Sequence, residues 1–257
     1  MNQTLRTVIK IVLTILLVAS LTSLIFSLSL YQFTSYKNLE PRLSYSIEQQ
    51  YSQETQDNYS DFERTKDEIT ENCYNHQEID YFLNIQNTAT KISINCSGIN
   101  NETTTENFIK IVSDGIFKSV YYKNYDCSFI NCLNQIQSNP ENVFILVSKT
   151  GNSFLLNFMI ISLIISLLLI SGIVLLSKFK LTCLYNLAPA FLISGLLFLT
   201  KNTINSLAST NEGPIKSLVE LLAKTLFINF LIIFIFGAIF LILTIIFRVT
   251  KKSEEPK

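Results

Sequence analysis

The chain has 257 residues, of which 48% are hydrophobic and 16% are charged, and its 20 basic and 20 acidic residues give a formal net charge of zero. Soluble domains carry about 25% charged residues, and here the charges gather in some segments and are missing from others. This composition excludes a single soluble globule, a disordered acidic chain and a basic nucleic-acid binder. It predicts a membrane protein with a water-facing part.

Four apolar stretches are long enough to cross a bilayer. A helix needs about 20 apolar residues to cross roughly 30 Å of hydrocarbon, because each residue adds about 1.5 Å. The third stretch contains Pro189 and is short, so a re-entrant hairpin is the alternative for it. The first could instead be a cleaved signal peptide, but its apolar run exceeds the usual core of about 7–15 residues, which favours an uncleaved anchor. The predicted transmembrane helices are residues 9–31, 154–177, 181–200 and 225–247.

Basic residues beside these stretches predict the orientation. They precede the first stretch, fill the short link between the second and third, and follow the fourth in the tail 248–257. With four transmembrane helices these three regions share one side, and Lys and Arg mark the cytoplasmic side. Residues 32–153, with nine basic and sixteen acidic residues, then lie outside together with the loop 201–224. We expect a multi-pass protein of the cell membrane with both termini in the cytoplasm.

The extracytoplasmic segment 32–153 is predicted to form a small α+β domain. Its first part, residues 43–72, is polar with a thin helical stripe, which fits either a helical stalk or a solvated linker. The α+β part is residues 79–148. Runs rich in β-branched residues at 79–85, 90–96 and 142–148 are its predicted strands.

Two helix starts are marked by local signals. Thr103 followed by Glu106 matches a capping box, and the helix after it places Ile109, Val112, Ile116 and Val120 on one face. Pro214 predicts a helix start in the loop 201–224. That helix either lies on the outer leaflet or extends the fourth transmembrane helix.

Four of the five cysteines lie in the extracytoplasmic segment: Cys73, Cys96, Cys127 and Cys132. An even number outside the cytoplasm predicts disulfides, and we favour the pairs Cys127–Cys132 and Cys73–Cys96 because each joins neighbouring elements. Two alternatives remain open. The four cysteines could be buried free thiols, or Cys73, His76, Cys127 and Cys132 could form a zinc site, since these residue types and spacings suit tetrahedral coordination.

Three sequons in the same segment are candidate glycosylation sites. Asn58, Asn95 and Asn101 each begin an N-x-S/T triplet and are predicted to face the compartment where glycans are added. The chain is rich in Asn, so such triplets also arise by chance.

The predicted transmembrane helices carry no acidic, basic or histidine residue away from their edges, which argues against a proton-coupled transporter. Three amides are predicted to form interhelical polar contacts: Asn157 and Asn229 near the outer third, which we expect to pair, and Asn186 near the inner third.

Small residues predict where these helices pack closely. They are Ser20, Ser23 and Ser27 in the first helix, Ser162 and Ser166 in the second, and Gly237 and Ala238 in the fourth.

No phosphate-loop, dinucleotide or serine-hydrolase motif occurs, so no catalytic residue and no cofactor is assigned. The leading hypothesis is a non-enzymatic, receptor-like or accessory subunit. Its external domain would bind another membrane or extracellular protein, and it would bind no nucleic acid. The alternative is a permease-like component of a membrane transport or export complex, because such subunits share the layout of one helix, a large external domain and further helices.

Overall fold

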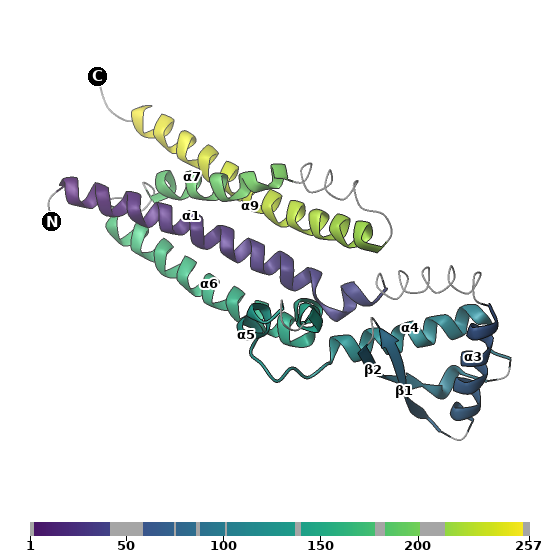
Figure 1. Ribbon diagram of the computed structural model, residues 1–257. Helices are drawn as coiled ribbons and strands as arrows, with labels where there is room; N and C mark the ends of the chain where they lie inside the picture. Colours follow the sequence, from purple (N-terminus) through teal and green to yellow (C-terminus); the bar gives the residue numbers. More distant parts are fainter. Residues whose placement is uncertain are drawn as a thin grey trace. The chain divides into compact units, whose positions relative to one another are not determined.

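The computed structural model describes residues 3–41, 59–74, 76–85, 88–100, 102–136, 140–177, 183–200 and 214–253. The chain divides into two compact units. The first, the helical unit, comprises Met1–Phe33, Phe154–Asn211 and Val219–Lys257. The second, the mixed unit, comprises Thr34–Ser153 and Glu212–Leu218 and holds the two strands (Figure 1).

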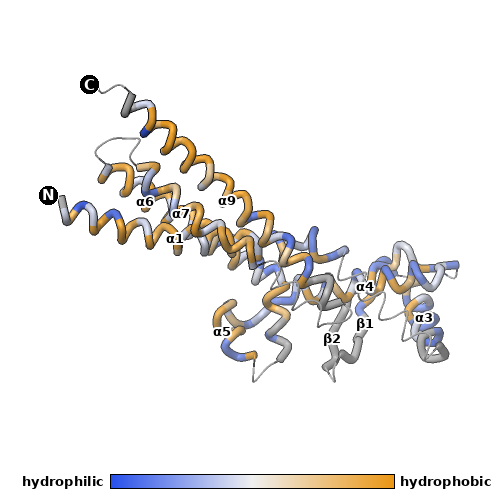
Figure 2. The backbone as a smooth tube through the Cα atoms, turned by 90° about the horizontal axis from the view of Figure 1, so that it is seen from above, coloured by the Kyte–Doolittle hydropathy of each residue, from blue (hydrophilic) through white to orange (hydrophobic). Residues whose placement is uncertain are grey.

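Three long helices dominate the helical unit and coincide with three of the predicted apolar stretches: α1 (Gln3–Phe33), α6 (Lys149–Leu176) and α9 (Pro214–Ser253). Within them, apolar segments of 30, 28 and 32 residues are long enough to cross a bilayer. Figure 2 shows them as mainly hydrophobic along their length. The chain is therefore a multi-pass membrane protein by the length and composition of its helices.

The third predicted stretch forms a shorter apolar helix. It consists of α7 (Leu184–Gly195), which contains Pro189, and a continuation in tighter 3-10 geometry, η4 (Leu196–Thr200). Leu187 and Ala190 of α7 pack in one cluster with Leu17 and Leu21 of α1 and Ile173 of α6. One face of the short helix is thus packed against α1 and α6, and its opposite face is exposed.

Glycines set the distance between α7 and α9. A Cβ atom added to Gly195 would lie 2.5 Å from the backbone nitrogen of Phe234, and one added to Gly237 would lie 2.7 Å from that of Leu192. Side chains at either position would overlap the facing helix, so the two backbones are in direct contact. This is the close approach expected at Gly237.

A serine seam joins α1 to α6. Ser20 Oγ lies 2.8 Å from Ser166 Oγ and donates to the carbonyl oxygen of Ser162 over 3.2 Å. Ser162 and Ser166 are both buried. The small residues on these two faces therefore meet, as their spacing predicts.

In the mixed unit, β1 (Glu78–Ile85) and β2 (Thr88–Asn95) form an antiparallel hairpin in which Glu78 is opposite Asn95. The strands predicted at 79–85 and 90–96 are therefore present and pair with each other. Helix α4 (Thr105–Tyr121) lies against β2, where Gly115 brings it so close that an added Cβ would be 2.8 Å from the carbonyl oxygen of Ser93. A core forms between them from Ile94 of β2, Phe108, Val112 and Ile116 of α4, and Ile69 of α3 (Tyr59–Cys73).

The cap of α4 lies one residue later than predicted. Thr104 Oγ1 accepts the Asn107 backbone N–H over 3.4 Å and is the N-cap. Thr103 Oγ1 instead accepts the backbone N–H of Asn100 over 2.8 Å and stabilises the preceding turn. Three of the predicted face residues, Ile109, Val112 and Ile116, are buried, and Val120 is half-buried.

The predicted strand at 142–148 is wrong. This run forms a 3-10 helix, η2 (Pro140–Val147), which contacts the short helix α5 (Phe129–Asn134). Asn142, Ile145 and Ser148 are buried, a period of three residues that matches the turn of a 3-10 helix. A short apolar run is equally compatible with a strand or a buried helical turn, and here its buried positions follow the helical period.

The sequence left alternatives open for residues 43–72 and for the helix that begins at Pro214, and the structure describes part of the first stretch and all of this helix. Of the polar stretch 43–72, residues 59–72 belong to a helix, α3 (Tyr59–Cys73), and residues 43–58 lie outside the described residues. Pro214 does begin a helix, which runs unbroken for 40 residues as α9. The segment 214–224 is thus the extended start of the last long helix.

Candidate functional site

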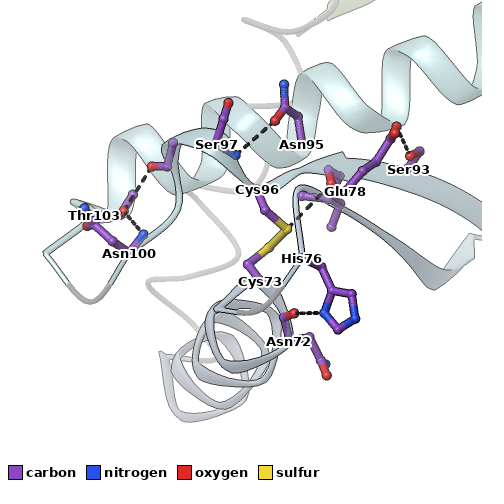
Figure 3. Close-up of a disulfide and its surroundings, with 12 residues drawn as sticks. Asn72, Cys73, His76, Glu78, Ser93, Asn95, Cys96, Ser97, Asn100 and Thr103 are labelled. Carbon is purple, nitrogen blue, oxygen red and sulfur yellow. Dashed lines mark hydrogen bonds between the residues drawn. A yellow bond between two sulfur atoms is a disulfide. The ribbon is translucent and has the colours of Figure 1, made fainter.

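Two disulfides brace the mixed unit, and their pairing is the one favoured from the sequence. Cys73 at the end of α3 is bonded to Cys96, the first residue of the 3-10 turn η1 (Cys96–Gly98) that follows β2, as Figure 3 shows. Cys127 is bonded to Cys132, which encloses the start of α5. Cys183 is a buried free thiol at the start of α7.

The zinc alternative is wrong, because its four ligands do not converge. Cys73 belongs to one disulfide, and Cys127 and Cys132 form the other. The fourth, His76, has its Nδ1 atom 2.9 Å from the carbonyl oxygen of Asn72 (Figure 3). Among the described residues no group of three His, Cys, Asp or Glu side chains is placed to hold a metal ion.

Of the three sequons, one lies in the described part of the chain. Asn95 is exposed at the end of β2, and its Oδ1 atom accepts the backbone N–H of Ser97 over 3.0 Å, which caps η1 (Figure 3). Asn58 and Asn101 lie outside the described residues.

The amides of the long helices differ in their surroundings. Asn229 of α9 donates from Nδ2 to Ser29 Oγ and to Gln32 Oε1 of α1, each over 2.9 Å. Asn157 is exposed on α6, and Asn186 is half-buried on α7. The structure thus gives Asn229 partners on α1.

A recess of about 430 Å³, with more apolar than polar surface in its wall, opens between the end of the hairpin and α4. Gly98 and Gly115 form part of its wall, and α4 approaches β2 closely at Gly115. The side chains in the wall that carry polar groups are Glu78, Ser93, Asn95, Ser97, Asp114, Lys118, Ser119 and Tyr122.

The recess combines hydrogen-bond acceptors and donors with a wall that is mostly apolar by area. Glu78 accepts a hydrogen bond from Ser93 across the hairpin. Asp114 supplies a second carboxylate, Lys118 supplies an ammonium group one turn further along α4, and Ile111 supplies an apolar contact. Such a wall suits a protein loop that makes apolar contacts and is oriented by a few hydrogen bonds and ion pairs.

An aromatic cluster adjoins the recess. It consists of Tyr36, Phe117, Tyr121 and Tyr122. The Tyr36 ring centroid lies 5.2 Å from those of Phe117 and Tyr121 and 5.7 Å from that of Tyr122, within the range of favourable ring contacts. Tyr122 also lines the recess, so the two features share one side chain.

The aromatic cluster lies beside the segments that adjoin α1 and α6 in the chain. Tyr36 comes three residues after the end of α1, and the ammonium group of Lys149, the first residue of α6, lies 5.6 Å from the Tyr122 ring centroid. Asn152 also donates to Thr34 Oγ1 over 3.0 Å. Burial raises the pKa of the Tyr36 phenol above 10.0, and the charge of Glu40 adds to the effect.

Neither the recess nor the cluster was predicted from the sequence. The adjacent pair Tyr121-Tyr122 at the end of an amphipathic helix was the available signal for the cluster. The recess had no comparable signal, because it depends on the approach of α4 to β2. Comparison with protein-family models, with curated proteins and with solved structures gives no match.

Proposed function

We propose that the chain is a non-enzymatic multi-pass membrane protein, a receptor-like or accessory subunit whose extracytoplasmic residues 32–153 bind a partner protein. The recess is the binding site in this proposal. The observation that carries it is the position of Tyr122, which lines the recess and belongs to the aromatic cluster. A partner bound in the recess would contact a ring that packs against Tyr36 and Lys149, the residues next to α1 and α6.

The proposed topology has four transmembrane helices with α7 and η4 as the third. Twelve α-helical residues and five 3-10 residues extend about 28 Å, close to the roughly 30 Å of the hydrocarbon layer. The basic flanks favour cytoplasmic termini. Glycans at Asn58, Asn95 and Asn101 belong to the same proposal. Protease added to intact cells would then cleave within residues 32–153. Cleavage only after lysis would show that these residues face the cytoplasm, which is the opposite orientation.

A site-specific crosslinking experiment tests the binding site. A photo-reactive residue replaces Lys118 in the recess, and the matched control replaces Tyr74, which is 84% exposed in the same unit. We expect one partner to be captured in native membranes from position 118 and not from position 74. Capture should be lost when Asp114→Lys replaces a carboxylate of the wall with an ammonium group.

Three outcomes would count against the proposal. Equal capture from both positions would show non-specific collision, and capture that survives Asp114→Lys would place the contact elsewhere. A crosslinked ATPase subunit would favour the permease-like alternative.

A further inference from the structure

The segment between the aromatic cluster and α6 has an unusual surface for a water-facing domain. Residues 59–126 contain 17 charged residues, whereas residues 127–148 contain one, Glu141. Three of the five large apolar side chains exposed in the described part of 34–153 lie in this short segment: Ile130 (57%), Phe144 (41%) and Leu146 (41%). The described surface of the segment is therefore uncharged and carries three large apolar side chains among neutral polar ones.

The geometry of η2 explains why these side chains point outward. Ile145 is fully buried, and its neighbours Phe144 and Leu146 fall on the other sides of the 3-10 helix. Polar residues at these two outward positions would satisfy the fold equally well. The apolar residues there are thus unexplained by the packing of η2 itself.

The chain connection places η2 beside a bilayer. Ser148 alone separates η2 from α6, and its Oγ accepts the backbone N–H of Gly151 in the first turn of α6 over 3.2 Å. An added Cβ on Gly151 would lie 2.1 Å from the carbonyl oxygen of Ile145, so η2 packs directly against that turn. Phe144 and Leu146 are therefore fixed next to the first residues of α6.

The length of α6 shows what surrounds that turn. Its 28 residues extend about 42 Å, whereas the hydrocarbon layer is about 30 Å thick. The helix is therefore about 12 Å longer than the hydrocarbon layer. If this difference is shared equally between its two ends, about four residues at each end lie in the headgroup region. At the first end these are residues 149–152. The carbonyl group of Ile145 packs against Gly151 in this turn, so η2 folds back beside residues 149–152. Phe144, the neighbour of Ile145, is thus placed at the same interfacial layer.

We propose that residues 127–136 and 140–147 form an interfacial anchor, in which Ile130, Phe144 and Leu146 insert into the headgroup region of the leaflet that α6 enters. The Cys127–Cys132 disulfide holds the α5 part of this anchor closed, with Cys132 fully buried and Ile130 exposed. The occupant of the apolar surface is the lipid bilayer. An uncharged surface with aromatic and aliphatic side chains is what the interface favours.

The absence of tryptophan from the chain gives a direct test. Phe144→Trp makes a protein with one tryptophan, which is reconstituted at full length in phosphatidylcholine vesicles. Tyr74→Trp, at an exposed position far along the chain from α6, is the aqueous control. Phe158→Trp, at an exposed position within α6, is the bilayer control. Emission is quenched either by brominated phosphatidylcholine or by aqueous iodide.

We expect the tryptophan at position 144 to lose most of its emission to brominated lipid and little to iodide, as at position 158 and opposite to position 74. Leu146→Trp should behave in the same way, and Ile130→Trp provides a third position if either η2 variant fails to fold. Quenching of these tryptophans by iodide alone would overturn the proposal. Protection from both quenchers would also overturn it, because it would show that protein covers the surface.

Discussion

Asn229 Nδ2 lies 2.9 Å from Ser29 Oγ, and this contact ties the last long helix to the first. Ser29 is fully buried, and the same amide nitrogen also donates to Gln32 Oε1. Of the three amides singled out in the sequence, Asn229 is the one with a hydrogen-bond network to another helix among the described contacts. We expected Asn229 to pair with Asn157. Its hydrogen bonds are instead to Ser29 and Gln32 of α1, and Asn157 is exposed on α6.

Asn229→Leu should therefore destabilise the helical unit. The change removes the donor that Ser29 and Gln32 share, and hydrogen bonds between membrane helices contribute about 0.6 kcal/mol each on average. We expect a loss of about 1 kcal/mol in the free energy of unfolding, measured in mixed micelles. Asn157→Leu, at an exposed position on α6, is the matched control and should have no destabilising effect. Equal losses in both variants would contradict this role of Asn229.

The contact between α7 and α9 should not tolerate a methyl group. Gly195→Ala would place its Cβ 2.5 Å from the Phe234 backbone, and overpacking of this kind costs about 1–3 kcal/mol. Gly172→Ala is the control, since its Cβ would make an ordinary 3.6 Å contact with Leu13. Thermal unfolding of the purified variants separates the two cases. A Gly195 variant as stable as the Gly172 variant would show that the helices can move apart at no cost.

The two disulfides should contribute unequally. Cys73–Cys96 closes a loop with a sequence separation of 23 residues and Cys127–Cys132 one of 5 residues. Loop-closure entropy then gives about 3 and about 2 kcal/mol. Replacement of each pair by serine, followed by hydrogen exchange of the α4 amides, measures the difference. Replacement of Cys73 and Cys96 should increase exchange more than replacement of Cys127 and Cys132, because the first pair borders the core around Ile94. The reverse order would show that native-state effects outweigh loop closure.

Stability should fall at high pH through Tyr36. The folded state raises the pKa of this phenol above 10.0, mainly by burial. Its stabilising contribution is therefore complete below pH 10.0 and is lost as pH rises through the folded pKa, because the unfolded chain releases the proton first. Thermal unfolding at about pH 9 and about pH 11 measures the decline.

Tyr36→Phe keeps the ring contacts and should reduce that decline. Tyr74→Phe, at an exposed position, should leave it unchanged. An identical decline in all three proteins would assign the effect to other groups.

Hydropathy and spacing predicted the features that depend on local pattern. Residue type and period predicted the long apolar helices, the two strands of the hairpin, and the buried face with Ile109, Val112 and Ile116. They also predicted the contact between Ser20 and Ser166. The cap at Thr104 was missed by one residue because Thr103 and Thr104 both have a suitable hydroxyl. Only the turn at Asn100, which uses Thr103, distinguishes them.

The features that were missed depend on contacts between distant segments. The run 142–148 has the composition of a strand, and its 3-10 form is consistent with the direct contact between Ile145 and Gly151. The recess likewise exists because Gly115 lets α4 approach Ser93, which no local pattern reveals. Asn229 was recognised as a polar contact, but its partners Ser29 and Gln32 lie about two hundred residues away in the chain.

The three-residue repeat of Asn142, Ile145 and Ser148 has a consequence for how this segment can diverge. Deletion or insertion of a single residue would turn Ile145 outward and would move another side chain against the first turn of α6. Related chains should therefore vary in residue identity at positions 144 and 146 within the limits of hydrophobicity, while the number of residues from 142 to 151 stays constant.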